Sequence, residues 1–340
     1  MKTYTHTQED IMAAKSLKLV IKDGAKNVEQ LHKFQKIAKI TSIVLIYAFI
    51  VAMAFIVIVP FYWMIATSLK SEYEIRETLT YYPHTIQWIN YKVLFAGAEK
   101  STFMYDPVAG MVAGNLNDIN VISPFEFWTF LANTLIVGVI STLGTLFTTI
   151  LAAFAFSRLN FKGKDTLFTI FLATMMIPGE MFTITNYITV SNLGWLDSTA
   201  GQLACMIVPF WVSVFYIFQL RQNFKQIPNE LYYAAKVDGK SDWQYLWKVM
   251  VPLASPSLIT ILILKVMGSW NAYVWPDLVG SEESYTMAVG LRRYSPSPFG
   301  SPHQGIQMAA TVLVTVPLFL LFVFFRKYIM RGVGRAGIKG

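Results

Sequence analysis

The chain has 340 residues, of which 54% are hydrophobic and only 14% are charged, and its formal net charge is +8. Soluble domains usually carry about 25% charged residues, so this chain has too few to cover a water-soluble globule of its size. The composition therefore excludes an ordinary soluble protein and predicts an integral membrane protein.

The N-terminal segment, residues 1–39, carries eight Lys and four acidic residues. It contains no short apolar core of the kind that a signal peptide needs, and the apolar segment 40–69 that follows is too long to be one. A bilayer core about 30 Å thick needs about 20 apolar residues in a helix. We therefore expect a cytoplasmic tail or helix over 1–39, followed by a first membrane span.

Five further apolar segments are long enough to cross a membrane. They cover residues 127–157, 166–190, 198–220, 254–276 and 304–325. Two of them hold a charge, which is Glu180 in the second of the five and Lys265 in the fourth. The pattern predicts an all-α integral membrane domain of six helices over 40–325, with a second tail over 326–340.

The positive charges lie mostly on one side of this predicted topology. The two tails and the loops 158–165 and 221–250 hold 21 of the 28 Lys and Arg residues. Positively charged loops stay in the cytoplasm, so both termini are expected to be cytoplasmic. The net positive charge is thus explained by which segments stay in the cytoplasm, and it gives no support to a nucleic-acid partner.

The longest predicted external segment is 70–126, and its part from 110 to 120 is rich in loop-forming residues. We interpret this segment as a small external cap or a docking surface. The sequence assigns no role to the insert 101–125.

Motifs of enzyme active sites are missing from the sequence. Gly239-Lys240-Ser241 looks like the end of a phosphate-binding loop, but Ala234 stands where that loop needs its first glycine. The single cysteine, Cys205, lies in an apolar segment and is interpreted as a packing residue. We expect no catalytic residue, no metal site and no cofactor on this chain.

The most informative stretch lies in the predicted cytoplasmic loop 221–253. Pro228 suits the first turn of a helix, and Gly239 suits the left-handed conformation that ends one. Ser241 and Gln244 form a capping-box pattern that starts a second helix. These local signals alone leave two interpretations open, a helix pair that fits a partner's groove and an amphipathic loop on the membrane surface.

This stretch resembles the EAA loop of ATP-binding-cassette importer permeases. The family pattern is Glu-Ala-Ala, three residues, Gly, nine residues and Ile-x-Leu-Pro. This chain has Tyr233-Ala234-Ala235, then Gly239, then Val249 to Pro252 at the same spacing. It departs from the pattern at Tyr233, where the family usually has Glu, and Glu230 lies one turn earlier.

Other stretches resemble the carbohydrate branch of that family, and especially its smaller maltose-permease subunits. They are residues 152–158, 175–180, 269–276 and the glycine-rich end 331–340. Within 269–276 the family often has Asp where this chain has Ala272. The resemblance implies a six-span type I importer permease in the cell membrane.

The resemblance also implies a function. It predicts a permease subunit that moves a sugar or oligosaccharide together with a second permease, two ATPase subunits and an extracytoplasmic solute-binding protein. ATP and Mg would then bind the partner ATPase subunits. A permease for a peptide, polyol or phosphodiester is an alternative within the family, and a stand-alone secondary transporter is an alternative outside it.

Residue roles follow from the same resemblance. The residues expected to couple to the ATPase are Glu230, Leu231, Tyr233, Ala234, Ala235, Asp238, Gly239 and Trp243. For Trp243, anchoring at the membrane interface is an alternative. In the C-terminal tail, Gly337, Lys339 and Gly340 are expected to reach the ATPase subunits, with an exposed tail as the alternative.

The substrate path is expected to involve the fifth predicted span. Sugars stack on aromatic rings and hydrogen-bond to amides, so the candidates are Trp270, Asn271, Tyr273 and Trp275, unless these residues simply pack the bundle. Lys265 costs about 2.5–3.5 kcal/mol to place at mid-membrane, so it should face a cavity, a partner or a carboxylate. It could bind an anionic sugar or pair with an acid of the second permease.

Overall fold

A computed structural model covers residues 1–340 and describes the chain outside 1–7, 97–103, 107–109, 113–123, 295–302 and 335–340. The chain divides into two units, residues 1–63 and 64–340. Helix α1 (Gln8–Ser68) begins in the first unit and ends in the second.

Helix α1 joins the predicted tail and the first predicted span into one continuous helix. Every side chain from Phe34 to Trp63 is exposed, although this part of the helix is apolar and long enough to cross a membrane. A helix that is apolar on all sides needs lipid or a protein partner around it. The prediction of a helix or tail over 1–39 is consistent with this arrangement.

The other five predicted spans form two long helices and three broken ones. The long helices are α4 (Phe127–Arg158) and α15 (Gln304–Gly334). Each broken span consists of two helical segments that meet at a bend. The bend is 81° between 164–174 and 179–192, 42° between 199–210 and 214–226, and 77° between 242–253 and 255–270. Counting each pair as one span, the described residues hold up to six spans, as the hydropathy predicts.

Prolines coincide with these breaks, because proline lacks the backbone N–H that continues a helix. Pro178 precedes the short turn η1 (Gly179–Phe182), which leads from α5 (Lys164–Thr174) into α6 (Thr183–Asn192). Turn η2 (Trp195–Asp197) then leads to α7 (Thr199–Ile207), and Pro209 lies in turn η3 (Val208–Phe210), before α8 (Val214–Gln226).

The fifth predicted span is shorter than the sequence suggested. Helix α12 (Ser255–Trp270) ends before the predicted limit at Pro276, which belongs instead to α13 (Val274–Val279). Helix α14 (Met287–Arg293) completes this region. The apolar aromatic run 270–276 therefore contains a helix end and a turn, which hydropathy alone does not detect.

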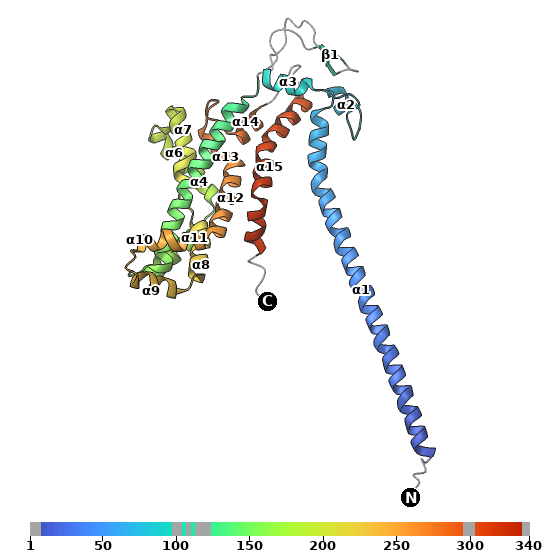
Figure 1. The fold of residues 1–340 in the computed structure, drawn as a ribbon. Coiled ribbons are helices and arrows are strands. Elements are labelled where there is room, and N and C mark those ends of the chain that lie inside the picture. The colour runs from blue at the N-terminus through green and yellow to red at the C-terminus, as the bar shows by residue number, and fades with distance from the viewer. Residues whose placement is uncertain (1–7, 97–103, 107–109, 113–123, 295–302, 335–340) are drawn as a thin grey trace. The chain divides into compact units, whose positions relative to one another are not determined.

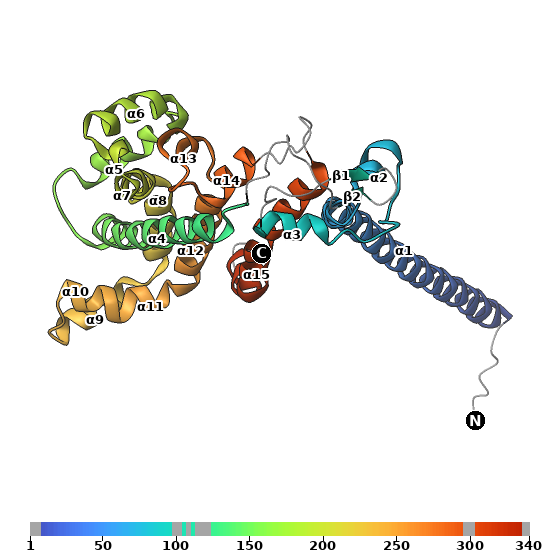
Figure 2. The same cartoon turned by 90° about the horizontal axis from the view of Figure 1, so that it is seen from above.

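Helix α4 is the centre of the second unit. It packs against α7, α8, α12 and α14, and Figures 1 and 2 both show it running through this part of the fold. Apolar packing is reinforced by polar bonds between segments that are distant in the sequence. The Asn133 amide donates to the Glu283 and Tyr285 carbonyls at 2.8 and 3.1 Å. Such bonds satisfy backbone groups that have no water to bind inside a bilayer.

The long segment 70–126, predicted to be external, contains a small sheet as well as helices. Helices α2 (Glu72–Glu77) and α3 (Ile89–Ala96) precede strands β1 (Met104–Asp106) and β2 (Gly110–Val112), which pair antiparallel. The first residues of the loop-like stretch 110–120 thus form a strand, and the described residues are otherwise helical or irregular. Residues 113–120 lie outside the described residues.

Buried Glu72 connects this external segment to the start of α15. It accepts a hydrogen bond from the Gln304 backbone N–H at 3.0 Å and lies 3.5 Å from the Nδ1 atom of buried His303. It also accepts from Arg76 at 2.6 Å. One carboxylate thus binds groups that are more than 200 residues apart in the sequence.

Gly290 marks the tightest contact between α14 and α4, and it supports a first prediction. A Cβ atom at this position would lie 2.3 Å from Cδ2 of Phe130. Gly290→Ala should therefore destabilise the protein by about 1–3 kcal/mol, because Phe130 has to move in a packed core. The apparent Tm in detergent should fall.

Gly268→Ala is the matched control, since no atom lies within 4 Å of its Cβ position and both glycines are helical. Alanine stabilises a helix interior by up to about 1 kcal/mol, so this control should keep or raise the Tm. Adding Phe130→Leu to Gly290→Ala should recover part of the loss. Equal Tm values for the two single variants would contradict the packing argument.

Candidate functional site

The predicted cytoplasmic loop folds into two short helices with well-formed ends. Helix α9 (Asn229–Val237) starts directly after Pro228, and Gly239 follows it with a φ of 72°. Helix α10 (Asp242–Tyr245) starts with the capping box of Ser241 and Gln244. A π turn, η4 (Leu246–Met250), and α11 (Val251–Leu253) then lead to α12. The sequence prediction of a helix pair with a glycine turn is confirmed.

A polar cluster holds α9 against α10. The Tyr232 hydroxyl donates to Asp242 Oδ1 at 2.7 Å, and the Lys236 ammonium lies 2.9 Å from the same oxygen. These two donors lower the pKa of Asp242, while its carboxylate raises the pKa of Lys236. Burial, followed by the bond to Asp242, raises the pKa of Tyr232. At neutral pH Asp242 and Lys236 are therefore both charged, and together with the Tyr232 hydroxyl they join α9 to α10.

One face of the helix pair is exposed. The large exposed side chains on it are Leu231, Tyr233, Val237 and Trp243, with exposed fractions of 42%, 63%, 88% and 57%. The smaller or charged candidates Glu230, Ala234, Asp238 and Gly239 are exposed as well. Trp243 packs edge-on against Trp247, with ring centroids 5.6 Å apart. An exposed apolar face of this kind is typical of a surface that binds a protein or a membrane.

Ala235 does not belong to this face. It is buried in an apolar cluster with Phe154 of α4 and with Leu220 and Phe224 of α8. The expectation that Ala235 contacts a partner directly is therefore wrong for its side chain, because the small residue is needed where α9 packs against the chain's own core. The spacing pattern assigns Ala234 and Ala235 the same role, so it could not show that Ala234 is exposed while Ala235 is buried.

Arg158 anchors the loop to the end of α4, and the sequence analysis assigned it no role. Its guanidinium donates to the Phe224 carbonyl at 2.8 Å, and also to the Ile227 carbonyl and to the Asn229 side chain. These acceptors lie at the end of α8 and the start of α9. The available signal was a basic residue at the last turn of a predicted span, where basic residues are common.

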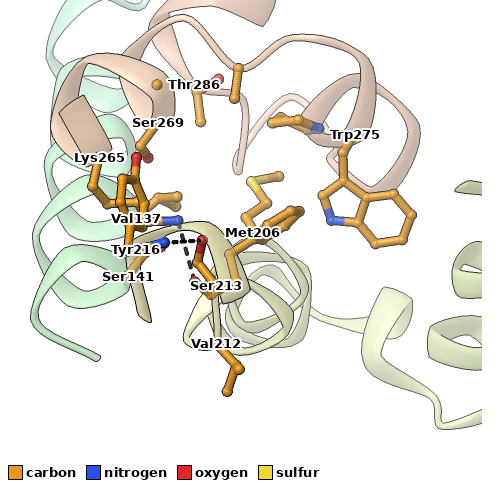
Figure 3. A pocket seen from close by; sticks show the side chains of 14 residues that line it. Val137, Ser141, Met206, Val212, Ser213, Tyr216, Lys265, Ser269, Trp275 and Thr286 are labelled. Carbon is orange, nitrogen blue, oxygen red and sulfur yellow. Dashed lines mark hydrogen bonds between the residues drawn. The ribbon is translucent and has the colours of Figure 1, made fainter. Parts of the chain in front are cut away.

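A cavity of about 350 Å³ lies within the membrane-spanning part of the second unit (Figure 3). Its hydroxyl-bearing side chains are Ser141, Ser213, Tyr216, Ser269 and Thr286, with Lys265 beside them. Trp275 and Phe210 add aromatic rings. The volume is within the range of small-molecule sites. Hydropathy and motif spacing gave no indication of the serines or of Tyr216.

Lys265 faces this cavity, as expected for an ammonium placed within a span. Its Nζ atom lies 3.3 Å from the Phe210 carbonyl oxygen and 5.4 Å from the centroid of the Phe210 ring. In the part of the chain that the structure describes, no acidic side chain forms an ion pair with it.

The aromatic substrate-path candidates do not form one site. Trp275 lines the same cavity as Lys265, but its indole N–H donates to the Cys205 carbonyl at 3.0 Å. Trp270 is buried in an apolar cluster with α15 and α14 residues. It also borders a second cavity of about 580 Å³, together with exposed Asn271 and Tyr273. Helix α12 ends at Trp270 and α13 begins at Val274, so the chain turns between these helices and Trp275 lines a different cavity from Trp270, Asn271 and Tyr273.

The other residues named from the sequence are Cys205 and three residues of the C-terminal tail. Cys205 is fully buried, which agrees with its interpretation as a packing residue. Gly337, Lys339 and Gly340 lie outside the described residues.

Comparison with protein families places this geometry in a known context. Residues 144–335, which include the loop, Arg158 and the residues around Lys265, match the family of the binding-protein-dependent transport system inner membrane component. The arabinooligosaccharides transport system permease protein AraQ of Bacillus subtilis is 31% identical over 214 residues, which cover 63% of this chain and 73% of AraQ. The lactose transport system permease protein LacG of Rhizobium radiobacter is 29% identical, covering 81% of this chain and 89% of LacG.

A solved structure supports the same fold. A chain of a bacterial ABC transporter involved in the import of the acidic polysaccharide alginate aligns with a TM-score of 0.64 and 20% identity. The alignment covers 96% of this chain and 99% of that one. The fold is therefore that of a type I ABC importer permease. The chain belongs to the family of binding-protein-dependent transport system inner membrane components, and it is a membrane protein.

Proposed function

We propose that this chain is a permease subunit that imports a sugar or oligosaccharide, driven by ATP hydrolysis on partner subunits. The observation that carries this proposal is the exposed, capped helix pair α9–α10, anchored to the end of α4 within the family-matched region. Relatives named for arabinooligosaccharide and lactose transport support the substrate class. A stand-alone secondary transporter would have no use for such a loop.

The helix pair acts as a rigid coupling element. Its exposed face, with Leu231, Tyr233, Ala234 and Trp243, docks in a cleft of the ATPase. Its buried side contacts α4 and α8 through Ala235 and Arg158. Because the Asp242 cluster and Arg158 fix the helices internally, a movement of the ATPase is transmitted to the membrane helices instead of being absorbed within the loop.

Tyr233 changes the chemistry of the docking face. Where the resembled pattern has a glutamate, this chain exposes a phenol ring, with the Tyr232 ring 6.0 Å away. The cognate ATPase cleft should therefore offer apolar surface or a hydrogen-bond acceptor at this point, and not depend on an ion pair there.

The assembly around the chain follows from the same proposal. It contains a second permease, two ATPase subunits that bind ATP and Mg, and an extracytoplasmic solute-binding protein. The distribution of Lys and Arg supports cytoplasmic termini, so the loop 221–253 and the ATPases share one side of the membrane. The C-terminal residues Gly337, Lys339 and Gly340 would then be close enough to reach the ATPases.

The proposal is tested by purifying the tagged chain from its native membranes and identifying the proteins that accompany it by mass spectrometry. Recovery of an ATPase and a second permease supports the importer. Recovery of the chain alone, with sugar uptake that does not require ATP, would reject it in favour of a secondary carrier.

Gly239 gives a sharper prediction for the docking face. Gly239→Trp places a large side chain on that face at a φ of 72°, with open space around its Cβ position. It should abolish ATP-dependent sugar uptake, measured in membrane vesicles, while the inserted amount of protein stays unchanged. The left-handed conformation itself costs a non-glycine residue only about 1–2 kcal/mol.

Gly163→Trp is the matched control, because Gly163 also has a positive φ, of 78°, and open space, but it starts α5 outside the loop. It should retain most of the uptake. Gly239→Asn, which tolerates the left-handed conformation, should retain more than Gly239→Trp. Normal uptake by Gly239→Trp would show that this face does not couple.

Arg158 gives a prediction for the transmission step. Arg158→Met leaves the Phe224 and Ile227 carbonyls without this donor, which should weaken the attachment of the loop to α4 by about 1–3 kcal/mol. The expected result is ATP hydrolysis that continues with less sugar moved per ATP. Lys162→Met, which removes an exposed charge four residues away, should leave that ratio unchanged. An unaltered ratio in Arg158→Met would refute the anchoring role.

A further inference from the structure

We propose that Lys265 binds the carboxylate of an acidic sugar, so that the transported substrate contains a hexuronate unit. This inference rests on the proposed function as a sugar permease and narrows its substrate class. It rests on three observations. The Lys265 ammonium faces a cavity, the cavity is lined by hydroxyl groups and aromatic rings, and the Phe210 carbonyl that Lys265 contacts has a second, neutral donor nearby.

The Lys265 ammonium has unused hydrogen-bonding capacity. It carries three N–H donors, and the described contacts use one of them, toward the Phe210 carbonyl at 3.3 Å. The Phe210 ring centroid lies 5.4 Å away and adds only weak stabilisation of the positive charge. An ammonium inside a membrane span needs a counter-charge, and no described acidic side chain pairs with it.

The bond to Phe210 does not explain why a lysine is present. The Thr145 hydroxyl oxygen lies 2.8 Å from the same carbonyl oxygen, and its one hydrogen is shared with the Ser141 carbonyl, which also lies 2.8 Å away. A neutral donor is therefore nearer to the Phe210 carbonyl than the ammonium is, so this carbonyl does not by itself call for a charged side chain at 265. The positive charge is left available to an anion that enters the cavity.

The cavity has the composition of a sugar site with one anionic position. Hydroxyl groups of Ser141, Ser213 and Ser269 line it, and Lys265 is the only charged side chain among its lining residues. Figure 3 shows Lys265 and Ser269 on one side of the cavity in this view and Trp275 on the other. Hydroxyls and an aromatic ring suit a sugar ring, and the ammonium suits a charged substituent on it.

A single positive charge favours a carboxylate over a phosphate monoester. Phosphate carries close to two negative charges at neutral pH and is usually bound by arginine, by several cations or by backbone N–H groups at a helix start. The lining residues include one lysine and no arginine. The match in charge is therefore to a monoanion, and a hexuronate supplies a monoanion on a sugar ring.

The test measures uptake by the complete transporter, reconstituted in proteoliposomes with its binding protein. The probes are trimers of galacturonate, glucuronate, mannuronate and guluronate, their carboxyl-reduced neutral analogues, and glycerol 3-phosphate. At least one uronate trimer should be taken up, and at least tenfold faster than its neutral analogue. Lys265→Met should reduce kcat/KM for that trimer roughly 10- to 100-fold, as expected for the loss of a charged hydrogen bond.

Lys162→Met is the control, since it removes an exposed lysine outside the cavity and should leave uptake unchanged. Uptake of neutral sugars alone, or uronate uptake that is unaffected by Lys265→Met, would overturn this inference and leave the proposed function intact. Lys265-dependent uptake of glycerol 3-phosphate with no uronate uptake would also overturn it, in favour of a phosphate. An importer that hydrolyses ATP but moves no sugar of either kind would reject the proposed function itself.

A second measurement separates a substrate from an ion pair with the other permease. Carbodiimide treatment joins an ammonium to a carboxylate that it contacts, through an amide bond and with loss of water. With the uronate trimer present, mass spectrometry should find the sugar on the Lys265 peptide. A link from Lys265 to an acid of the second permease, or failure of Lys265→Met to co-purify with that permease, would contradict the inference.

Discussion

The break at Pro209 is the feature on which the membrane part of this structure depends, because it exposes backbone groups where water cannot satisfy them. Proline has no N–H to donate to the carbonyl four residues earlier, which belongs to Cys205. The Trp275 indole supplies that bond at 3.0 Å. The Thr145 and Thr148 hydroxyls of α4 lie within hydrogen-bonding distance of the Phe210 and Trp211 carbonyls that follow, and each shares its one hydrogen with a carbonyl of α4. A broken helix is stable in a bilayer only when neighbours satisfy its backbone in this way.

The segment after this break also lines the cavity and leads from it to the loop 221–253. Helix α8 starts just after the break, with Ser213 and Tyr216 at the cavity, and its last turn contains Phe224, whose carbonyl binds Arg158. At 1.5 Å per residue, its 13 residues span about 20 Å. One continuous helix therefore joins the candidate substrate site to the proposed coupling loop, so a movement of that loop would reach the cavity without an intervening hinge.

The sequence predicted the features that depend on local chemistry. The span positions follow from runs of apolar residues, and the helix pair around Gly239 follows from its glycine and from the Ser241 capping box. It did not predict features that depend on contacts between distant segments. The burial of Ala235, the anchoring by Arg158 and the end of α12 at Trp270 are all decided by α4 and α8 packing or by bends, which single-sequence periodicity does not report.

Tyr233 and Ala272 depart from the resembled family pattern, and neither lies in the apolar core. Tyr233 is on the docking face, while Ala272 lines the same cavity as Lys265. Where the pattern often has aspartate, Ala272 carries no charge, so the cavity contains an ammonium and no opposing carboxylate. Such changes at exposed or cavity positions alter what the protein binds while the helix packing is kept. The fold is thus shared with the family, while the single charge among the cavity's lining residues is the feature from which we propose a preference for an acidic sugar.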